Sequence, residues 1–138
     1  MYLTYTEYTD MCGTLEETAF EQFEFEARSV IDYWTFNRLQ NETEYPEAVK
    51  RCMFALINLI KAKQDAMVTT AVAEDGSVQA GISSESNDGV STSYNTLSAK
   101  DAVTTMQSEI ELTVKRYLSA VKNSLGHKVL YRGVYPNE

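Results

Sequence analysis

The fold class is decided by residues 46–60, PEAVKRCMFALINLI. Apolar side chains recur there at the spacing of one helical face, and they are Val49, Cys52, Met53, Leu56, Ile57 and Ile60. Pro46 suits the first position of this helix, because the N–H that proline lacks would have no intrahelical partner there. Lys61 and Lys63 follow near the end of the helix, where the helix dipole favours cations. The stretch therefore predicts a long helix with one buried side.

Two more helices are predicted upstream. A helix over about residues 15–36 follows from apolar residues at steps of three and four, namely Phe20, Phe23, Ala27, Val30, Ile31 and Trp34. Acidic side chains cover much of its remaining surface, at Glu16, Glu17, Glu21, Glu24 and Glu26. Thr14 and Glu17 have the spacing of a capping box, as do Thr4 and Glu7. The second pair opens a short first helix that we expect to stop near Gly13.

A last helix is predicted downstream, over about residues 98–125. Its apolar positions step by three and four through Val103, Met106, Ile110, Val114, Tyr117, Val121 and Leu125. Gly126 follows as the expected residue just past the helix end. Twenty-eight residues would make about 42 Å of helix at 1.5 Å per residue, which is long for a chain of this size.

The segment between these last two helices, about residues 68–96, has a different character. It has no Lys or Arg and is rich in serine and glycine. Alternating residues predict a β-hairpin around Asn87-Asp88-Gly89, with Val78, Ala80, Ile82 and Ser84 on one strand and Val90, Thr92 and Tyr94 on the other. A three-residue loop would pair Ser86 with Val90 and keep Ile82 opposite Tyr94. An isolated two-stranded hairpin is only marginally stable in water. The segment is therefore either an arm that becomes ordered on assembly or a mobile loop.

The tail, residues 127–138, is extended in character and apolar. Its candidate contact residues are Leu130, Tyr131, Arg132, Val134 and Tyr135. An apolar tail beyond the last helix is expected to pack against its own bundle or against a neighbouring molecule. The interface candidates of the whole chain are these five residues together with the seven of the hairpin strands.

These elements predict a mainly α protein, a small bundle of one short and three longer helices. The helical core covers about residues 4–67 and 98–125, the hairpin or long loop protrudes between the last two helices, and the tail follows. The chain has 138 residues and a mass of 15.6 kDa, which corresponds to one domain over residues 1–138. A chain of this size buries roughly two-thirds of its unfolded surface and needs neither metal nor disulfide for a core.

The net charge of −8 argues against a nucleic-acid binder that works by neutralising phosphates. The charge is uneven, because residues 1–47 carry 11 acids against Arg28 and Arg38, whereas residues 48–138 carry 9 acids and 10 bases. A molecule with one acidic half can stack head to tail on itself. No apolar run approaches the length of a transmembrane helix, and the first seven residues lack the pattern of a secretory signal.

No constellation for chemistry is found, so neither an enzyme nor a cofactor is expected. His127 is the only histidine and follows a helix-ending glycine, where capping or simple exposure is expected. Cys12 and Cys52 are far apart, which fits a reducing compartment, and too few His and Cys residues exist for a zinc site. The carboxylates of the acidic helix are expected to form a solvated face. Such a chain suits interaction or assembly.

Five stretches, in this order and spacing, resemble the small head-tail connector proteins of long-tailed bacteriophages and of prophages in Gram-positive bacteria. They are residues 1–8 (MYLTYTEY), 27–36 (ARSVIDYWTF), 45–53 (YPEAVKRCM), 81–91 (GISSESNDGVS) and 130–134 (LYRGV). Together they span essentially the whole chain, and their specificity lies in the combination, because none of them is a chemical signature.

The resemblance implies a structural virion protein located at the head-tail interface, and in the host cytoplasm during assembly. It implies a cyclic ring of roughly twelve copies beneath the portal, if the ring follows the portal's symmetry. Its partners would be further copies of itself, the portal protein, and the next connector, stopper or tail protein. DNA would pass through the ring without specific binding, and no membrane is involved. The alternative from another class is an acidic regulatory protein, such as a DNA mimic that inhibits a basic host protein.

Overall fold

This computed structural model describes residues 1–71, 84–87, 90–93 and 99–136 of the chain. Most of these residues lie in four helices. The helices are α1 (Tyr5–Asp10), α2 (Glu17–Thr35), α3 (Glu47–Ala71) and α4 (Ala99–Leu118). Two short strands, β1 (Ser84–Asn87) and β2 (Val90–Ser93), precede α4. The prediction of a mainly helical bundle is confirmed.

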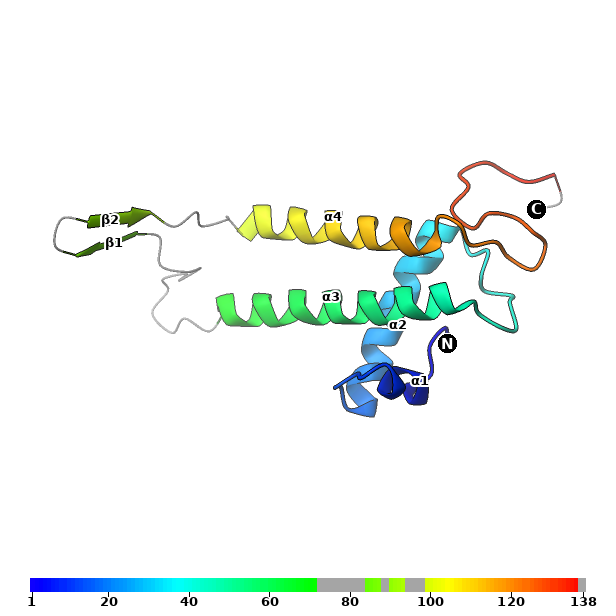
Figure 1. Ribbon diagram of the computed structural model, residues 1–138, viewed down its shortest axis with the longest axis horizontal. Coiled ribbons are helices and arrows are strands. Elements are labelled where there is room, and N and C mark those ends of the chain that lie inside the picture. Colours follow the sequence, from blue (N-terminus) through cyan, green and yellow to red (C-terminus); the bar gives the residue numbers. More distant parts are fainter. Residues whose placement is uncertain (72–83, 88–89, 94–98, 137–138) are drawn as a thin grey trace.

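The helices are arranged as an antiparallel pair crossed by a third helix. Figure 1 shows α3 and α4 side by side with opposite directions, and α2 running across them from α1 toward the C-terminal tail. The tail and the loop between α2 and α3 lie together at one end of the antiparallel pair. The arrangement brings the C-terminal end of α2 beside the tail, although nearly 100 residues separate them in sequence.

The core is built on the stripe that residues 46–60 predicted. All six of its members are buried in α3. They pack with side chains of the other helices and of the two chain ends, among them Leu3, Tyr8, Phe20, Ala27, Ile31, Leu39, Val114, Leu118 and Val129. Each fully buried Leu, Ile or Val contributes about 1.5–3 kcal/mol relative to an exposed one, so this stripe is a large contribution to the stability of the bundle.

The short first helix begins as predicted. Thr4 and Glu7 form a reciprocal capping box, in which each side chain accepts a hydrogen bond from the other residue's backbone N–H. The helix ends at Asp10, and the left-handed residue after it is Cys12 rather than Gly13. Gly13 serves a different purpose, because a Cβ at this position would lie 2.1 Å from the ring of Tyr8.

The capping box predicted for the second helix is wrong. The N-cap of α2 is Glu16, with no side-chain cap, and Thr14 does not cap the helix. The backbone N–H groups of Thr14 and Leu15 point instead at the hydroxyl oxygen of Tyr8, at 3.3 and 3.4 Å. The buried Tyr8 thus fixes the position of Thr14, the residue that the local sequence pattern had predicted as the cap.

One glutamate of α2 is buried, although the acidic residues of this helix were predicted to form a solvated face. Glu24 is only 2% exposed, whereas Glu17 and Glu21 are exposed as expected. Four residues of the predicted apolar face are buried, and Val30 and Trp34 are half-buried. The helix ends where Phe36 and Asn37 both take left-handed backbone angles, with φ of 54° and 60°.

The last helix ends seven residues earlier than predicted, at Leu118 instead of Leu125. The chain turns back after it, because the Val129 N–H donates to the Val121 carbonyl, and Lys122 and Lys128 form an antiparallel bridge. Val121, at the start of this turn, is buried, whereas Leu125 is 69% exposed. Gly126, with φ of 80°, lies in the turn and not at a helix end. The apolar spacing of the helix continues to Leu125 in the sequence. The helix nevertheless ends at Leu118, because the chain turns back and thereby buries Val129.

The predicted hairpin register is wrong by one residue. The structure pairs Asn87 with Val90 and Ser86 with Ser91, so only two residues connect β1 and β2. Asp-Gly is a favoured two-residue connection, and four-residue strands made mostly of polar residues have no apolar face that fixes a different register. Of the interface candidates in this segment, Ser84, Val90 and Thr92 belong to the paired strands. The others, Val78, Ala80, Ile82 and Tyr94, lie outside the described residues.

The two cysteines are expected to differ sharply in reactivity. Cys52 is buried and Cys12 is exposed, and burial raises the pKa of the Cys52 thiol to about 12 from its ordinary value of 9.0. We expect Ellman's reagent at pH 8 to titrate one thiol per native chain and two in denaturant. A C12S variant should show no reactive thiol while native, and two thiols reacting equally fast in the native chain would contradict the burial.

The same pKa shift has a consequence for stability. Above pH 9 the Cys52 thiol ionises in the unfolded chain but stays protonated in the folded chain. The contribution of this group is therefore complete below pH 9 and is lost as the pH rises toward 12.

Candidate partner interface

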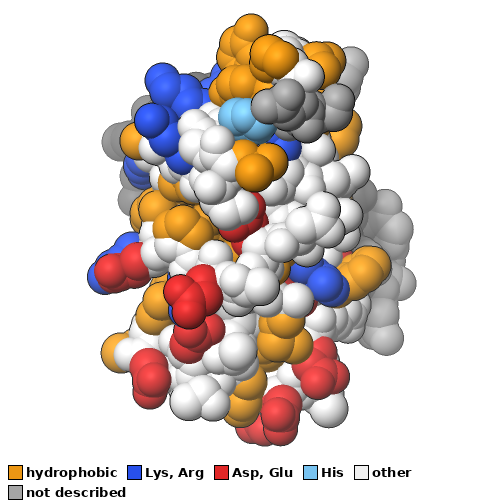
Figure 2. Space-filling view, turned by 90° about the vertical axis from the view of Figure 1, so that its right-hand side faces the viewer, with side chains coloured by type: hydrophobic (Ala, Val, Ile, Leu, Met, Phe, Trp, Pro, Cys, Tyr) orange, Lys and Arg blue, Asp and Glu red, His pale blue; other side chains and the backbone are white. Residues whose placement is uncertain are grey.

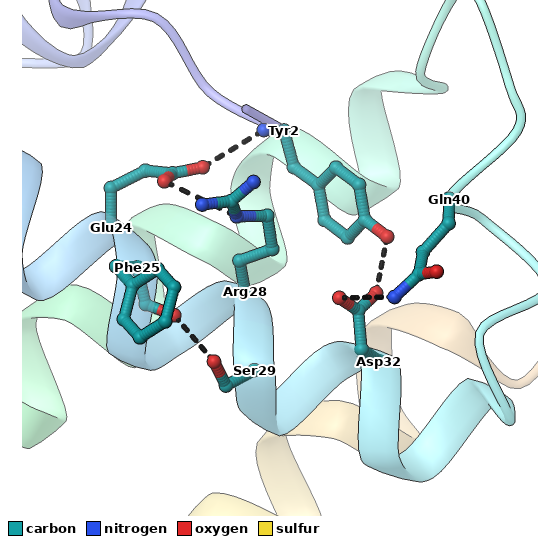
Figure 3. A network of polar contacts seen from close by, with 7 residues as sticks. All are labelled: Tyr2, Glu24, Phe25, Arg28, Ser29, Asp32 and Gln40. Carbon is teal, nitrogen blue, oxygen red and sulfur yellow. Dashed lines mark hydrogen bonds and ion pairs between the residues drawn. The ribbon is translucent and has the colours of Figure 1, made fainter.

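The N-terminal segment is locked against α2 by a polar network (Figure 3). The Tyr2 N–H donates to Glu24 Oε1 at 2.9 Å, and Glu24 Oε2 lies 3.5 Å from Arg28 Nε. The Tyr2 hydroxyl donates to Asp32, which also accepts from Gln40 Nε2 at 3.2 Å. Burial, together with Asp32, raises the pKa of Tyr2. The network joins residue 2, α2 and the loop after it, and so positions the end of α2.

A single arginine in that loop holds the C-terminal tail. The Arg38 guanidinium donates to three backbone carbonyls of the tail, those of Val129 at 3.4 Å, of Gly133 at 2.7 Å, and of Tyr131. Arginine suits this task because its donors form a rigid planar fork. The tail therefore packs on its own bundle, which was one of the two predicted alternatives, and Val129 is completely buried.

Aromatic rings complete the attachment of the tail. The Arg38 guanidinium lies over the rings of Phe36 and Tyr135, at 5.3 and 5.2 Å from their centroids. Tyr135 stacks on His127 with centroids 3.8 Å apart and accepts a hydrogen bond from the Lys128 N–H through its hydroxyl. His127 is thus half-buried in a ring stack, which corrects the expectation of a capping or simply exposed histidine.

Beside this attachment lies a hollow lined by aromatic and polar residues. Its volume is about 700 Å³, and it is lined by Asp32, Tyr33, Trp34, Phe36, Asn37 and Arg132. Two cations face the Trp34 ring, with the Arg132 guanidinium carbon at 5.7 Å and Lys115 Nζ at 5.9 Å from its centroid. A surface that combines exposed aromatic rings with arginine has the composition of the energetic centres of protein interfaces.

The predicted tail residues divide into two groups. Tyr131, Arg132 and Val134 are exposed, Val134 at 81%, and are available to a partner. Leu130 and Tyr135 are half-buried, the first against the core and the second in the ring stack. The structure thus brings only part of the predicted set to the surface of the tail.

Four residues of this region escaped prediction as contact residues, namely Tyr33, Trp34, Phe36 and Arg38. Trp34 was assigned to the apolar face of α2, and Tyr33 and Phe36 carried no separate expectation as part of an interface. The one local signal for Arg38 is that it is one of two bases among the first 47 residues. Its partners lie more than 90 residues away, which no local pattern indicates.

The surface around the tail is basic. Residues 112–136 contain five bases and no acid, and the bases are Lys115, Arg116, Lys122, Lys128 and Arg132. All five are exposed. Figure 2 looks onto this end of the molecule and shows Lys and Arg beside hydrophobic side chains at the top, and Asp and Glu gathered toward the bottom. We call the described surface of these five bases, with Tyr131 and Val134, the basic tip.

The described residues contain no other feature that indicates chemistry. They hold no group of three or more His, Cys, Asp or Glu side chains placed to bind a metal ion. No helix within the described ranges has the length and apolar character that crossing a bilayer requires. Comparison of the chain with protein families, with functionally characterised proteins and with solved structures finds no significant match.

Proposed function

We propose that this chain is a structural virion protein, a head-tail connector that forms a ring beneath the portal and joins capsid to tail. The single observation that carries the proposal is the C-terminal tail, which Arg38 holds in place. The tail presents Tyr131, Arg132 and Val134, which are part of the basic tip, to a partner. A tail that is already ordered binds with a smaller loss of conformational entropy than a disordered one. The resemblance of the sequence to connector proteins supplies the identity of the partners.

In this proposal the copies surround a channel through which DNA passes. Roughly twelve copies follow from matching the cyclic symmetry of a portal. The portal protein would bind one face of the ring, and the next connector, stopper or tail protein the other. A net charge of −8 suits a channel, because few Lys and Arg contacts would hold the passing DNA. No step of this function requires a cofactor or a catalytic residue.

The rival proposal, an acidic regulatory protein that mimics DNA, is less well supported by the charge distribution. A DNA mimic needs carboxylates spread along an extended surface to occupy a basic groove. Here the exposed acids Glu16, Glu17 and Glu21 lie at one end of α2, and the opposite end of the molecule is basic. A surface with two charged ends suits assembly better than groove filling.

Native mass spectrometry tests the proposed function. The purified chain is measured over a concentration series, alone and after addition of a purified portal ring. We expect a closed oligomer of about twelve copies, alone or bound to the portal, on the symmetry argument above. Absence of any closed oligomer in both conditions would contradict the connector proposal, and capture of a basic host protein by the monomer would favour the rival.

Deletion of residues 78–94 tests the contribution of the hairpin arm, most of which lies outside the described residues. We expect the shortened chain to keep its helical circular dichroism, because described residues of α2, α3 and α4 form a buried core with one another. Ring formation should be lost, since strand pairing between copies or to the portal would be removed. Rings that persist in the deleted chain would contradict a role of the arm in assembly.

A further inference from the structure

The basic tip and an acidic end lie at opposite ends of α2. The helix starts beside α1 and finishes beside the tail (Figure 1), and its 19 residues span about 28 Å at 1.5 Å per residue. Residues 1–27 contain seven acids and no base, whereas residues 112–136 contain five bases and no acid. The molecule is therefore electrically polar along α2.

Two like charges are opposed within the basic tip. Lys122 and Lys128 are directly opposite each other in an antiparallel bridge, and both side chains are exposed. Like charges in opposed positions destabilise a strand pair. Within the described part of the chain no carboxylate forms an ion pair with either lysine. An acidic partner placed across this pair would remove the repulsion and gain two charge-assisted contacts.

The acidic end offers carboxylates that are free to serve as that partner. Asp10, Glu16, Glu17 and Glu21 are exposed and take part in no ion pair among the described residues. Glu7 differs, because Lys50 pairs with it and lowers its pKa. The four free carboxylates come from the end of α1, the N-cap of α2 and the first turns of α2, and we call this surface the acidic end.

We propose that the basic tip of one copy docks onto the acidic end of a second copy. The argument is charge complementarity, because one chain carries both a cationic surface with exposed aromatic rings and an anionic surface, on opposite ends. The two surfaces differ, so the contact is head to tail, and repeated contacts close into a ring if the rotation between copies permits. The inference rests on the proposed function only in naming a ring as the closed product.

The hollow beside Trp34 supports the same occupant. Arg132 lines it, and both Arg132 and Lys115 face the Trp34 ring. Lys115 already pairs with Glu111, and Asp32 also lines the hollow. An acidic segment that docked there would place a carboxylate against Arg132 and its aliphatic stems against aromatic rings. The aromatic lining then excludes water from the ion pairs and strengthens them.

Reciprocal charge reversal tests the docking. One variant, K122E/K128E, reverses the two opposed lysines and lowers the charge of the tip from +5 to +1. A second, E17K/E21K, reverses two of the four carboxylates and brings the acidic end from −4 to 0. The parent is expected to self-associate at low ionic strength in native mass spectrometry and analytical ultracentrifugation, and added salt should weaken it. Each variant alone should associate at least about tenfold more weakly, since one of its two docking surfaces has then lost most of its charge.

Mixing the two variants is the decisive step. In the mixture the unaltered tip of one variant meets the unaltered acidic end of the other, and the four reversed positions again face each other with opposite charge. Association should therefore return to within about threefold of the parent if pairing is electrostatic. K61E/K63E on α3 carries the same change in net charge away from the tip, and it should associate like the parent. Unchanged circular dichroism spectra establish that all variants are folded. If K122E/K128E does not fold, K122Q/K128Q replaces it, and if E17K/E21K does not fold, E17Q/E21Q replaces it, with weaker association of the neutralised variant as the result expected.

The outcomes separate this inference from the proposed function. A parent that stays monomeric throughout, reversed variants that associate like the parent, or a mixture that fails to recover would each overturn the docking. A connector that assembles through the hairpin arm would survive all three results. Conversely, a parent that associates head to tail but neither closes a ring nor binds a portal would overturn the connector function and leave the docking intact.

Discussion

Replacement of Arg38 by alanine is expected to release the tail and to lower the free energy of unfolding by about 2–4 kcal/mol. Three tail carbonyls lose a charged donor at once, and the rings of Phe36 and Tyr135 lose the guanidinium between them. Because Val129 is buried only while the tail is in place, part of the core is exposed as well. Urea unfolding followed by circular dichroism gives the magnitude.

Hydrogen exchange locates the effect of the Arg38 change. The amides of Lys128 and Tyr131, which are hydrogen-bonded within the tail, should lose most of their protection in R38A, whereas the exchange of the α3 amides should accelerate only in proportion to the loss of global stability. R38K keeps the charge but cannot span three carbonyls, so we expect it to recover only a minor part of the loss. R116A removes an exposed arginine and should change stability by less than about 0.5 kcal/mol. Equal stability of R38A and R116A would show that the attachment contributes nothing.

Replacement of Glu24 by alanine is expected to cost about 2–4 kcal/mol, because it leaves the buried Tyr2 N–H without an acceptor. The residues that this bond holds in place, Tyr2 and Leu3, are both buried. Their release would expose apolar surface at the start of the chain. The loss should appear as a lower urea midpoint and as faster proteolysis near the N-terminus.

Two comparisons isolate the role of the buried carboxylate. E24Q keeps an acceptor oxygen for the Tyr2 N–H and loses only the charged contact with Arg28, so its cost should be about 1 kcal/mol. E21A removes an exposed glutamate from the preceding turn and should be nearly neutral. An E24A variant as stable as E21A would refute the importance of the N-terminal lock.

The helices were predictable because their signal is local and repeated. The six apolar positions of α3 all became buried, and the face of α2 around Phe20, Ala27 and Ile31 did too. Helical periodicity records which side chains share a face, and a face of this apolarity must be covered in any compact structure. The capping box of Thr4 and Glu7 was predictable for the same reason, since all its atoms lie within four residues.

The errors lie where a distant residue competes with a local pattern. Thr14 was expected to cap α2, but the Tyr8 hydroxyl takes the backbone donors at this point. Leu125 continued the apolar spacing of α4, but the chain folds back so that Val121 and Val129 are buried. In both places local propensity supplies about 1 kcal/mol or less per residue, and burial of a large side chain outweighs it.

The candidate interface was only partly predictable. The sequence pointed to the tail as a contact segment, and three of its five named residues are exposed there. It did not distinguish them from Leu130 and Tyr135, which hold the tail in place. That distinction depends on Arg38, whose bonds to the tail link residues more than 90 positions apart.

The amino-acid sequence by itself determined the helical class, the buried stripe of α3 and the separation of acidic from neutral halves, because these properties are sums over neighbouring residues. Tertiary structure alone decided the rest. It buried Glu24 beneath the N-terminal segment, ended α4 at Leu118, and set the basic tip opposite the acidic end across the length of α2. These features arise when segments far apart in the chain compete for the same donors and the same buried volume, and only the folded arrangement settles that competition.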